Sequence, residues 1–227
     1  MNRAFTPDSS ARFENWAGNQ SVQPRSIHTP RTEREVAEII EEVRERGETL
    51  RAVGAGHSWS EIVPTRDHLV SLDEMRGVVR IDRDAGTVTV RAGTRLHELV
   101  GDLEDRGLAL PNLGSVAQQS IAGVISTGTH GTGIGLGNLS TMVRSLRLVN
   151  GEGEAIDVDP EETPELFDAA RIGLGSLGII TRVTLECVPA FNLHERSWSL
   201  GFDEALRQMP ELVERHDHIK FWWLPYT

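Results

Sequence analysis

The chain has 227 residues, of which 38% are hydrophobic and 25% are charged, a composition typical of a globular protein that buries a core. Its formal net charge of -11 argues against a surface that wraps nucleic acid or binds an anionic membrane, because both need clustered Lys and Arg. No apolar run, at the N-terminus or elsewhere, approaches the length that crosses a bilayer. The single cysteine, Cys187, excludes an internal disulfide framework, so we expect a soluble cytoplasmic protein in which Cys187 is a small buried residue. A phosphate-bearing ligand would have to be held mainly by backbone N–H groups.

The first predicted elements are a helix and a strand that lead into a glycine-rich turn. Thr32 and Glu35 have the spacing of a capping box, and the apolar residues after them repeat at helical intervals. Residues 50–53 are short and apolar enough for a buried strand, which runs directly into Gly54-Ala55-Gly56-His57-Ser58. A helix, a strand and a Gly-rich turn in this order are typical of the entrance to a cofactor site.

The middle of the chain alternates between strands and helices without a strict βαβ order. Hairpins are predicted from residues 77–82 with 87–92 and from 142–149 with 155–158, a helix from 96–105, a helix-like stretch from 165–171, and a strand from 179–187. This mixture indicates an α+β fold.

Beyond Pro189 the pattern changes. Residues 192–200 predict a strand, 203–213 a helix and 219–223 an aromatic-rich strand. So few elements rarely bury a core alone, and we therefore expect residues 190–227 to be the beginning of an incomplete second domain.

Two glycine motifs are candidates for phosphate binding. In residues 54–58, glycines let the backbone approach a ligand and successive N–H groups can form an anion-binding nest, although Trp59 stands where the dinucleotide fingerprint has its third glycine. Residues 173–178 fit GxGxxG in spacing, but a helix-like stretch precedes them and a β-branched run follows, which is the reverse of that fingerprint. They form either a turn close to a ligand or a purely structural turn.

Residues 120–133 are the most unusual segment, because small and hydroxyl-bearing residues dominate it. Such a stretch is expected neither to pack a conventional core nor to form a stable exposed helix, yet it offers many donors to a flat polar group. A flexible linker is the alternative, against which Ile121, Val124 and Ile125 argue.

Four segments in order carry a family resemblance: the helix-strand-GAGHS entrance, SIAGVISTGTHGTG, GLGSLGIITRVTL and the closing FWWLPYT. Together they resemble the FAD-linked oxidases of the vanillyl-alcohol oxidase fold, and within these the aldonolactone (gulonolactone and arabinonolactone) and alditol oxidases. The resemblance implies an FAD-binding domain in residues 1–189, made of two α+β subdomains of about 1–75 and 76–189, and the start of a cap domain in 190–227.

The same resemblance implies a cofactor site in which residues 54–58 hold the pyrophosphate and His57 is joined through a ring nitrogen to the 8α-methyl carbon of the flavin. The implied cofactor-binding residues are Gly54, Ala55, Gly56, His57, Ser58, Gly114, Ser115, Ser120, Gly123, Ser126, Thr127, Gly128, Thr129, His130, Gly131, Gly178 and Ile179. His130 either contacts the cofactor or is a structural histidine bonded to the backbone. Cys187 lies after the adenine-side loop, which argues against the second, cysteinyl flavin link of berberine-bridge-type enzymes.

Two positions favour an oxidase. Gly114 corresponds to a small residue beside the flavin face that oxygen reaches; plant-type galactonolactone dehydrogenases carry alanine there and leucine where His57 stands. A turn glycine without such a role is the competing interpretation.

The function implied is oxidation of a CH–OH group of a sugar lactone or polyol, with hydride passing to flavin N5 and electrons then to oxygen. No catalytic base is identified in this chain. Two alternatives remain: a flavin-binding subunit that needs a separate catalytic chain, and an acidic sugar- or nucleotide-binding module without flavin. A zinc site at His216 and His218 is disfavoured because no third ligand is evident.

Overall fold

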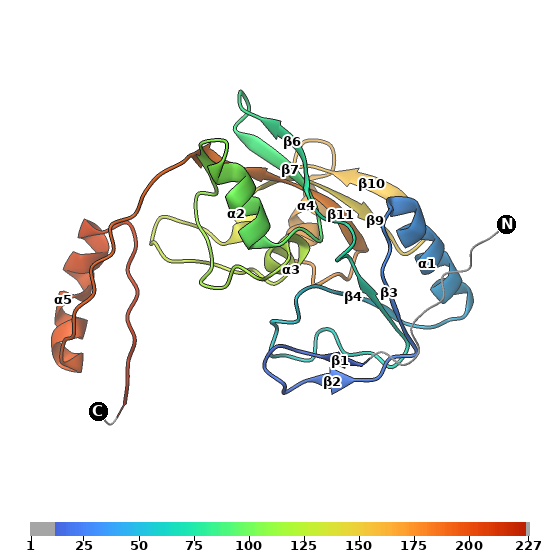
Figure 1. Ribbon diagram of the computed structural model, residues 1–227, viewed down its shortest axis with the longest axis horizontal. Coiled ribbons are helices and arrows are strands. Elements are labelled where there is room, and N and C mark those ends of the chain that lie inside the picture. The colour runs from blue at the N-terminus through green and yellow to red at the C-terminus, as the bar shows by residue number, and fades with distance from the viewer. Residues whose placement is uncertain (1–11, 226–227) are drawn as a thin grey trace.

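The computed structural model describes residues 12–225. Residues 1–11, in which the sequence shows no continuous apolar run, and the last two residues of the closing motif lie outside the described residues. The helices are α1 (Glu33–Glu45), α2 (Leu96–Glu104), α3 (Ile121–Ser126), α4 (Pro164–Arg171) and α5 (Phe202–Arg215), with a 3₁₀ turn η1 (Leu139–Met142). The strands are β1 (Phe13–Glu14), β2 (Ser21–Val22), β3 (Ser26–His28), β4 (Leu50–Val53), β5 (His68–Ser71), β6 (Val78–Asp82), β7 (Thr87–Arg91), β8 (Leu108–Ala109), β9 (Val143–Val149), β10 (Ala155–Val158), β11 (Ile179–Glu186) and β12 (Val188–Pro189). The mixture confirms the α+β class (Figure 1).

A small parallel sheet in the order β3-β5-β4 contains the first predicted strand. The predicted capping box is confirmed: Thr32 accepts from the Glu35 backbone and the Glu35 side chain accepts from the Thr32 backbone, so α1 begins at Glu33. The apolar face of α1 is buried. After this helix the chain continues into β4, which pairs in parallel with β5. β5 lies in the centre of the sheet and all four of its residues are buried.

A larger antiparallel sheet in the order β10-β9-β11-β7-β6 contains both predicted hairpins. β11 is its central strand and pairs with β9 on one side and β7 on the other. The two sheets use residues 26–71 and 78–186 respectively. One hydrophobic cluster nevertheless includes residues of both sheets, Val70 of β5 together with Val88 of β7 and Val183 of β11. The division into two subdomains therefore stays a prediction.

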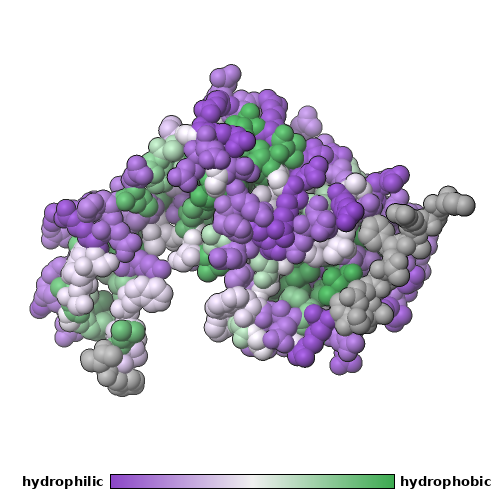
Figure 2. Space-filling view, in the orientation of Figure 1, coloured by the Kyte–Doolittle hydropathy of each residue, from purple (hydrophilic) through white to green (hydrophobic). Residues whose placement is uncertain are grey.

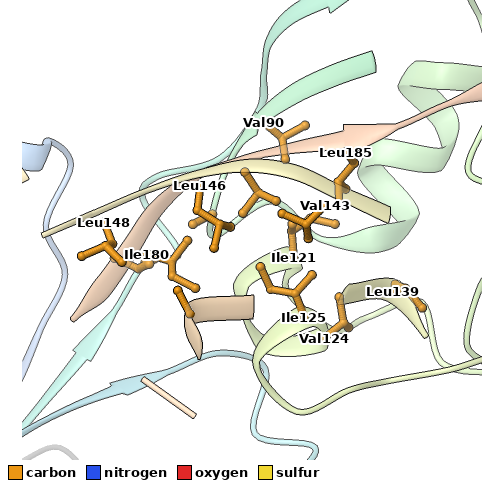
Figure 3. Packing of buried hydrophobic residues seen from close by; sticks show 14 of the residues in the cluster. Val90, Ile121, Val124, Ile125, Leu139, Val143, Leu146, Leu148, Ile180 and Leu185 are labelled. Carbon is orange, nitrogen blue, oxygen red and sulfur yellow. The ribbon is translucent and has the colours of Figure 1, made fainter. Parts of the chain in front are cut away.

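Residues 120–133 form more regular structure than the sequence predicts. Residues 121–126 are the helix α3, and Ile121, Val124 and Ile125 are fully buried, so the expectation that this stretch packs no conventional core is wrong. The three residues have i, i+3, i+4 spacing, which places them on one side of a helix. Figure 3 shows this side facing Val143 of β9 and Leu185 of β11.

The expectations for the last 36 residues are partly wrong. α5 confirms the predicted helix, but residues 192–200 and 219–223 are not strands. A strand needs a partner for its backbone N–H and C=O groups, and within residues 12–225 no strand pairs with either stretch. α5 has no buried residue, and Figure 1 shows it standing apart from the two sheets.

The surface and the remaining predictions fit a folded domain. Hydrophilic residues cover most of the face seen in Figure 2, and hydrophobic residues gather in smaller groups. Cys187 is buried as expected, and this burial raises the pKa of its thiol to about 11. Among the described residues, no helix combines the length and the apolar character needed to cross a membrane.

Candidate functional site

A cavity of about 330 Å³ lies where segments from both sheets meet α3. That volume lies within the range of small-molecule and cofactor sites. Its walls come from the ends of strands β4, β5 and β7, from α3 and from the start of β11. The residues that line it and are used below are Phe13, Asn15, Gln20, Gly54, Ala55, Gly56, His57, Ser58, Leu72, Asp73, Gly93, Gln119, Ser120, Ala122, Gly123, Ser126, Thr127, Thr129, Leu174, Gly175, Gly178 and Ile180.

Residues 54–58, directly after β4, all line this cavity. Gly56 has a φ of 68°, in the left-handed region that glycine adopts without strain. The backbone N–H groups of residues 55–58 donate no hydrogen bond to any described residue. Four successive amides without a described partner, around a left-handed glycine, are compatible with the anion-binding nest that the sequence predicts, which stays a prediction.

The carbonyl side of the same loop is held by the β1–β2 hairpin. The Trp16 N–H donates to the Gly56 carbonyl at 2.8 Å, and Asn15 Nδ2 donates to the Ser58 carbonyl at 2.9 Å. In a trans peptide the C=O and the following N–H point in opposite directions. Fixing the Gly56 carbonyl toward the hairpin therefore turns the His57 N–H away from it.

His57 lines the cavity, and its imidazole contacts Trp16 of the β1–β2 hairpin. The ring stacks on Trp16, with 5.5 Å between ring centroids and 27° between planes. Partial burial, and then the positive charge of Arg95, lower the pKa of His57 below its ordinary value. The imidazole is therefore neutral at neutral pH, the form in which a ring nitrogen has a free lone pair.

The second predicted segment contributes Ser120, Gly123, Ser126, Thr127 and Thr129 to the cavity wall. Ser120 caps α3 by accepting from the Gly123 N–H. A Cβ added to Gly54 would lie 2.5 Å from Ser120 Oγ, so the two motifs are in direct contact.

The third predicted segment contributes Gly178, but not Ile179. Gly178 has a φ of 141°, and an added Cβ would overlap the Val149 carbonyl oxygen. Ile179 is buried in the hydrophobic core, whereas the next residue, Ile180, lines the cavity. Leu174 and Gly175 of the GxGxxG stretch also line it, which favours the turn-near-a-ligand interpretation.

Besides Ile179, five predicted site residues are not among those that line the cavity. Gly128 follows α3 in a left-handed turn, and Gly131 packs against Asn112. Gly114 lies behind Thr129, since an added Cβ would be 3.0 Å from its methyl group. Ser115 accepts from Lys220 Nζ at 3.1 Å. The exposed His130 bonds through Nδ1 to the Gly131 carbonyl at 2.8 Å, the backbone bond of its alternative interpretation.

Other lining residues were missed by sequence reasoning, above all Gly93 and Asp73. Gly93 follows β7 and has no room for a side chain, because an added Cβ would overlap the Leu72 carbonyl. The sequence did contain a signal for Gly93, because a lone glycine after a predicted strand often marks a close approach of another backbone segment or a ligand. Asp73 forms ion pairs with Arg95 and with Arg76, which no local pattern indicates.

The described residues that line the cavity carry few charges. They include no Lys or Arg, and the titratable ones are His57 and Asp73. Binding of a diphosphate there would rest on backbone amides. The free amides of residues 55–58, the glycine-lined wall and the neutral imidazole fit an extended flavin nucleotide. Within residues 12–225, no three His, Cys, Asp or Glu side chains are grouped so as to hold a metal ion.

Comparisons with known proteins agree with this geometry. Residues 24–159 match the family described as FAD binding domain, and residues 183–227 match the D-arabinono-1,4-lactone oxidase family. The solved structure of alkyldihydroxyacetonephosphate synthase superposes with a TM-score of 0.67 over 76% of this chain and 33% of that one, at 20% identity, and supports the fold alone.

Three relatives represent the sequence matches. The D-arabinono-1,4-lactone oxidase of Eremothecium gossypii is 44% identical over 95% of this chain and 41% of its own length. The L-gulonolactone oxidase of Scyliorhinus torazame is 35% identical over 95% and 49%. The L-gulono-1,4-lactone dehydrogenase of Mycobacterium tuberculosis is 39% identical over 95% and 50%. The chain thus spans about half the length of the curated relatives it matches. Because the first family match covers more than half of the 227 residues, the chain belongs to the FAD binding domain family, and it resembles the aldonolactone oxidases and dehydrogenases.

Proposed function

We propose that the protein represented by this chain is an FAD-dependent oxidoreductase that oxidises a CH–OH group of a sugar lactone or alditol and passes the electrons to oxygen. The observation that carries the proposal is the cavity in which the GAGHS loop, α3 and the Gly178 turn meet. Relatives with 35–44% identity that are named lactone oxidases support the substrate class. When bound, the flavin supplies the redox chemistry by accepting hydride at N5.

The test is oxygen consumption by the flavin-loaded protein with a panel of aldonolactones, alditols and the corresponding free sugars. We expect oxygen uptake, with stoichiometric hydrogen peroxide, for a lactone or an alditol. Reduction of an artificial electron acceptor without oxygen uptake would replace the oxidase assignment by a dehydrogenase, the activity named for the Mycobacterium tuberculosis relative. No flavin reduction by any member of the panel would contradict the substrate class.

The cofactor is proposed to be covalently attached through His57. The bond would join an imidazole nitrogen of His57 to the 8α carbon, in place of the imidazole N–H and one 8α C–H. The two electrons and two hydrogens released would be taken up by the flavin itself, with dioxygen as the final oxidant and hydrogen peroxide as its product. The neutral imidazole at the cavity wall supports this role, because its lone pair is available as the nucleophile.

Acid precipitation tests the attachment. In wild-type protein the yellow colour should stay in the pellet, and in His57→Ala it should move to the supernatant or be absent. His130→Ala is the matched control and should keep flavin in the pellet, because this exposed histidine does not line the cavity and its bond among the described residues is to the Gly131 carbonyl. Flavin in the pellet of His57→Ala would contradict the assignment.

Gly114 supports oxygen as the acceptor, because an alanine there would press on Thr129 in the cavity wall. We expect Gly114→Ala to slow reoxidation of the reduced protein by oxygen and to leave the rate with an artificial acceptor unchanged. Equal slowing with both acceptors would contradict a role in oxygen access.

A second candidate is a flavin-binding unit whose substrate groups come from another polypeptide. It is favoured by the described residues that line the cavity, among which Asp73 is paired with two arginines and no other carboxylate occurs. FAD uptake without flavin reduction by any panel substrate, followed by reduction when a co-purifying chain is added, would favour this candidate.

A further inference from the structure

We propose that the β1–β2 hairpin positions His57 for flavin attachment, and that the indole of Trp16 is the surface that orients the imidazole. Trp16 is then a positioning residue, since it acts on His57 rather than on the flavin. The proposal rests on the proposed covalent link through His57.

The first support is the stacking geometry. The two rings are 5.5 Å apart and 27° from parallel, while 69% of the Trp16 surface stays exposed. A large apolar ring that stays exposed contributes little to the hydrophobic core. We therefore read the stacking on His57 as the main structural role of the Trp16 side chain. Stacking restricts rotation of the imidazole about its side-chain bonds and so fixes the direction of its nitrogen lone pairs.

The second support is that the hairpin holds the whole attachment loop by its carbonyl side. Beyond the bonds from Trp16 and Asn15, the Asn19 and Gln20 side chains donate to the Trp59 carbonyl at 3.1 and 3.3 Å. Phe13 packs near Gly56, where an added Cβ would lie 3.6 Å from its ring.

The hairpin is itself braced. Asn15 Nδ2 also donates to Asn19 Oδ1 at 2.7 Å, and the Gln20 N–H donates to Asn15 Oδ1 at 3.0 Å. Asn15 is buried, whereas Asn19 is exposed and Gln20 and Ser58 are half-buried. Its bonds to all three tie the hairpin to the loop. Misplacement of a reacting group by about 1 Å can slow a reaction by about 100-fold, so a loose imidazole should attach flavin slowly.

The experiment follows flavin attachment in the full chain. Apoprotein from riboflavin-starved cells is mixed with FAD, and protein-bound fluorescence after acid precipitation is measured against time. The variants are Trp16→Ala, Trp16→Phe, and Trp198→Ala as the control, because Trp198 is a similarly exposed tryptophan in the segment after β12. The dissociation constant for noncovalent FAD is measured separately for each change in a His57→Ala background.

We expect Trp16→Ala to slow attachment by about 10- to 100-fold with little change in the dissociation constant, since orientation rather than binding is lost. Trp16→Phe should recover most of the rate, and Trp198→Ala should match wild type. Attachment by Trp16→Ala at the wild-type rate would overturn the inference, and so would a dissociation constant that rises as much as the rate falls. Wild-type protein that binds FAD but never attaches it would overturn the covalent link itself together with this inference, an outcome distinct from the other two.

Discussion

Gly93 shows how little room the cavity wall leaves for side chains. A Cβ there would overlap the Leu72 carbonyl oxygen and crowd that of Met75, because the segment after β7 crosses the segment after β5 at this point. Gly54, in the loop after β4, likewise leaves no room for a side chain, because an added Cβ would overlap Ser120 Oγ. Both glycines are required for the close approach of backbone segments that shape the site.

Gly54→Ala should lower both FAD affinity and stability. The new methyl group displaces Ser120 Oγ, which then no longer caps α3, at a cost of about 1 kcal/mol in the free energy of unfolding. Urea unfolding and FAD titration measure the two effects. The control is Gly101→Ala in α2, where nothing lies near the added methyl and stability should rise by about 0.5 to 1 kcal/mol. A Gly54→Ala protein as stable as wild type would contradict the contact.

A buried polar cluster in the small parallel sheet is expected to make the stability of the protein depend on pH. Ser26 Oγ lies 2.8 Å from His28 Nε2 and 2.6 Å from His68 Nδ1, and His68 Nε2 donates to Glu48 Oε2 at 2.6 Å. Because the Glu48 carboxylate accepts from His68 Nε2, His68 Nδ1 accepts from the Ser26 hydroxyl. Ser26 Oγ in turn accepts from His28 Nε2. His28 Nδ1 is then a buried acceptor without a partner.

Protonation of His28 is therefore unfavourable in the folded state. Burial, then His68, and to a lesser degree Arg46, lower the pKa of His28, while Glu42 opposes them. Below the ordinary pKa of about 6.5, the unfolded chain binds a proton that the folded chain does not. The stability that neutral His28 contributes is thus fully present above pH 6.5, and it is lost as the pH falls toward the lowered pKa of His28.

Urea unfolding between pH 5 and 8 measures this effect. His28→Gln should flatten the acid loss of stability, which for one proton is at most about 1.4 kcal/mol per pH unit. His194→Gln, a change at an exposed histidine, should leave the profile as in wild type. An unchanged acid profile in His28→Gln would assign the loss to other groups.

At the scale of elements, sequence patterns predicted structure where local chemistry decides it. The capping box at Thr32, the period of the apolar residues in α1 and the turn residues between β6 and β7 each specify their element with no distant partner. The aromatic stretch 219–223 has strand-forming residues, but strand formation depends on a second strand, and none of the described strands pairs with it.

The same reasoning explains which site residues could be found. Residues 54–58 are contiguous and glycine-rich, so a local motif indicated them. Asn15, Gln20 and Asp73 reach the cavity only through contacts between segments distant in sequence, which no local pattern encodes. In α3 the sequence indicated the burial of Ile121, Val124 and Ile125, but the helix itself was missed because small and hydroxyl-bearing residues dominate the segment.

The turn after α3 offers a test of this element. Gly128 has a φ of 64°, and an added Cβ would meet only Asn138 and Ile172 at 3.6 and 4.0 Å, so the cost of Gly128→Val is backbone strain rather than a clash. We expect about 1 to 3 kcal/mol lower stability and weaker FAD binding, since Thr127 and Thr129 on either side line the cavity. Gly151→Val, where φ is ordinary and space is open, is the control. Wild-type FAD affinity in Gly128→Val would show that this turn does not shape the site.

At the scale of the whole molecule, the site is built from distant segments around one cavity in a chain with a net charge of -11. The β1–β2 hairpin holds the loop of residues 54–58 that forms one wall of the cavity, α3 forms another wall, and the start of β11 forms a third. Among the described residues that line the cavity there is no Lys or Arg, and we propose that the backbone amides of residues 55–58 take their place. Such an arrangement would allow an acidic protein to bind a diphosphate-bearing cofactor.

The most direct test of the account is peptide mapping of the purified protein, with flavin fluorescence and mass detected together. The account predicts one flavin-bearing peptide, and that peptide contains His57 with the flavin mass on the imidazole. Flavin on a peptide from another part of the chain, or colourless protein that takes up no FAD, would contradict it.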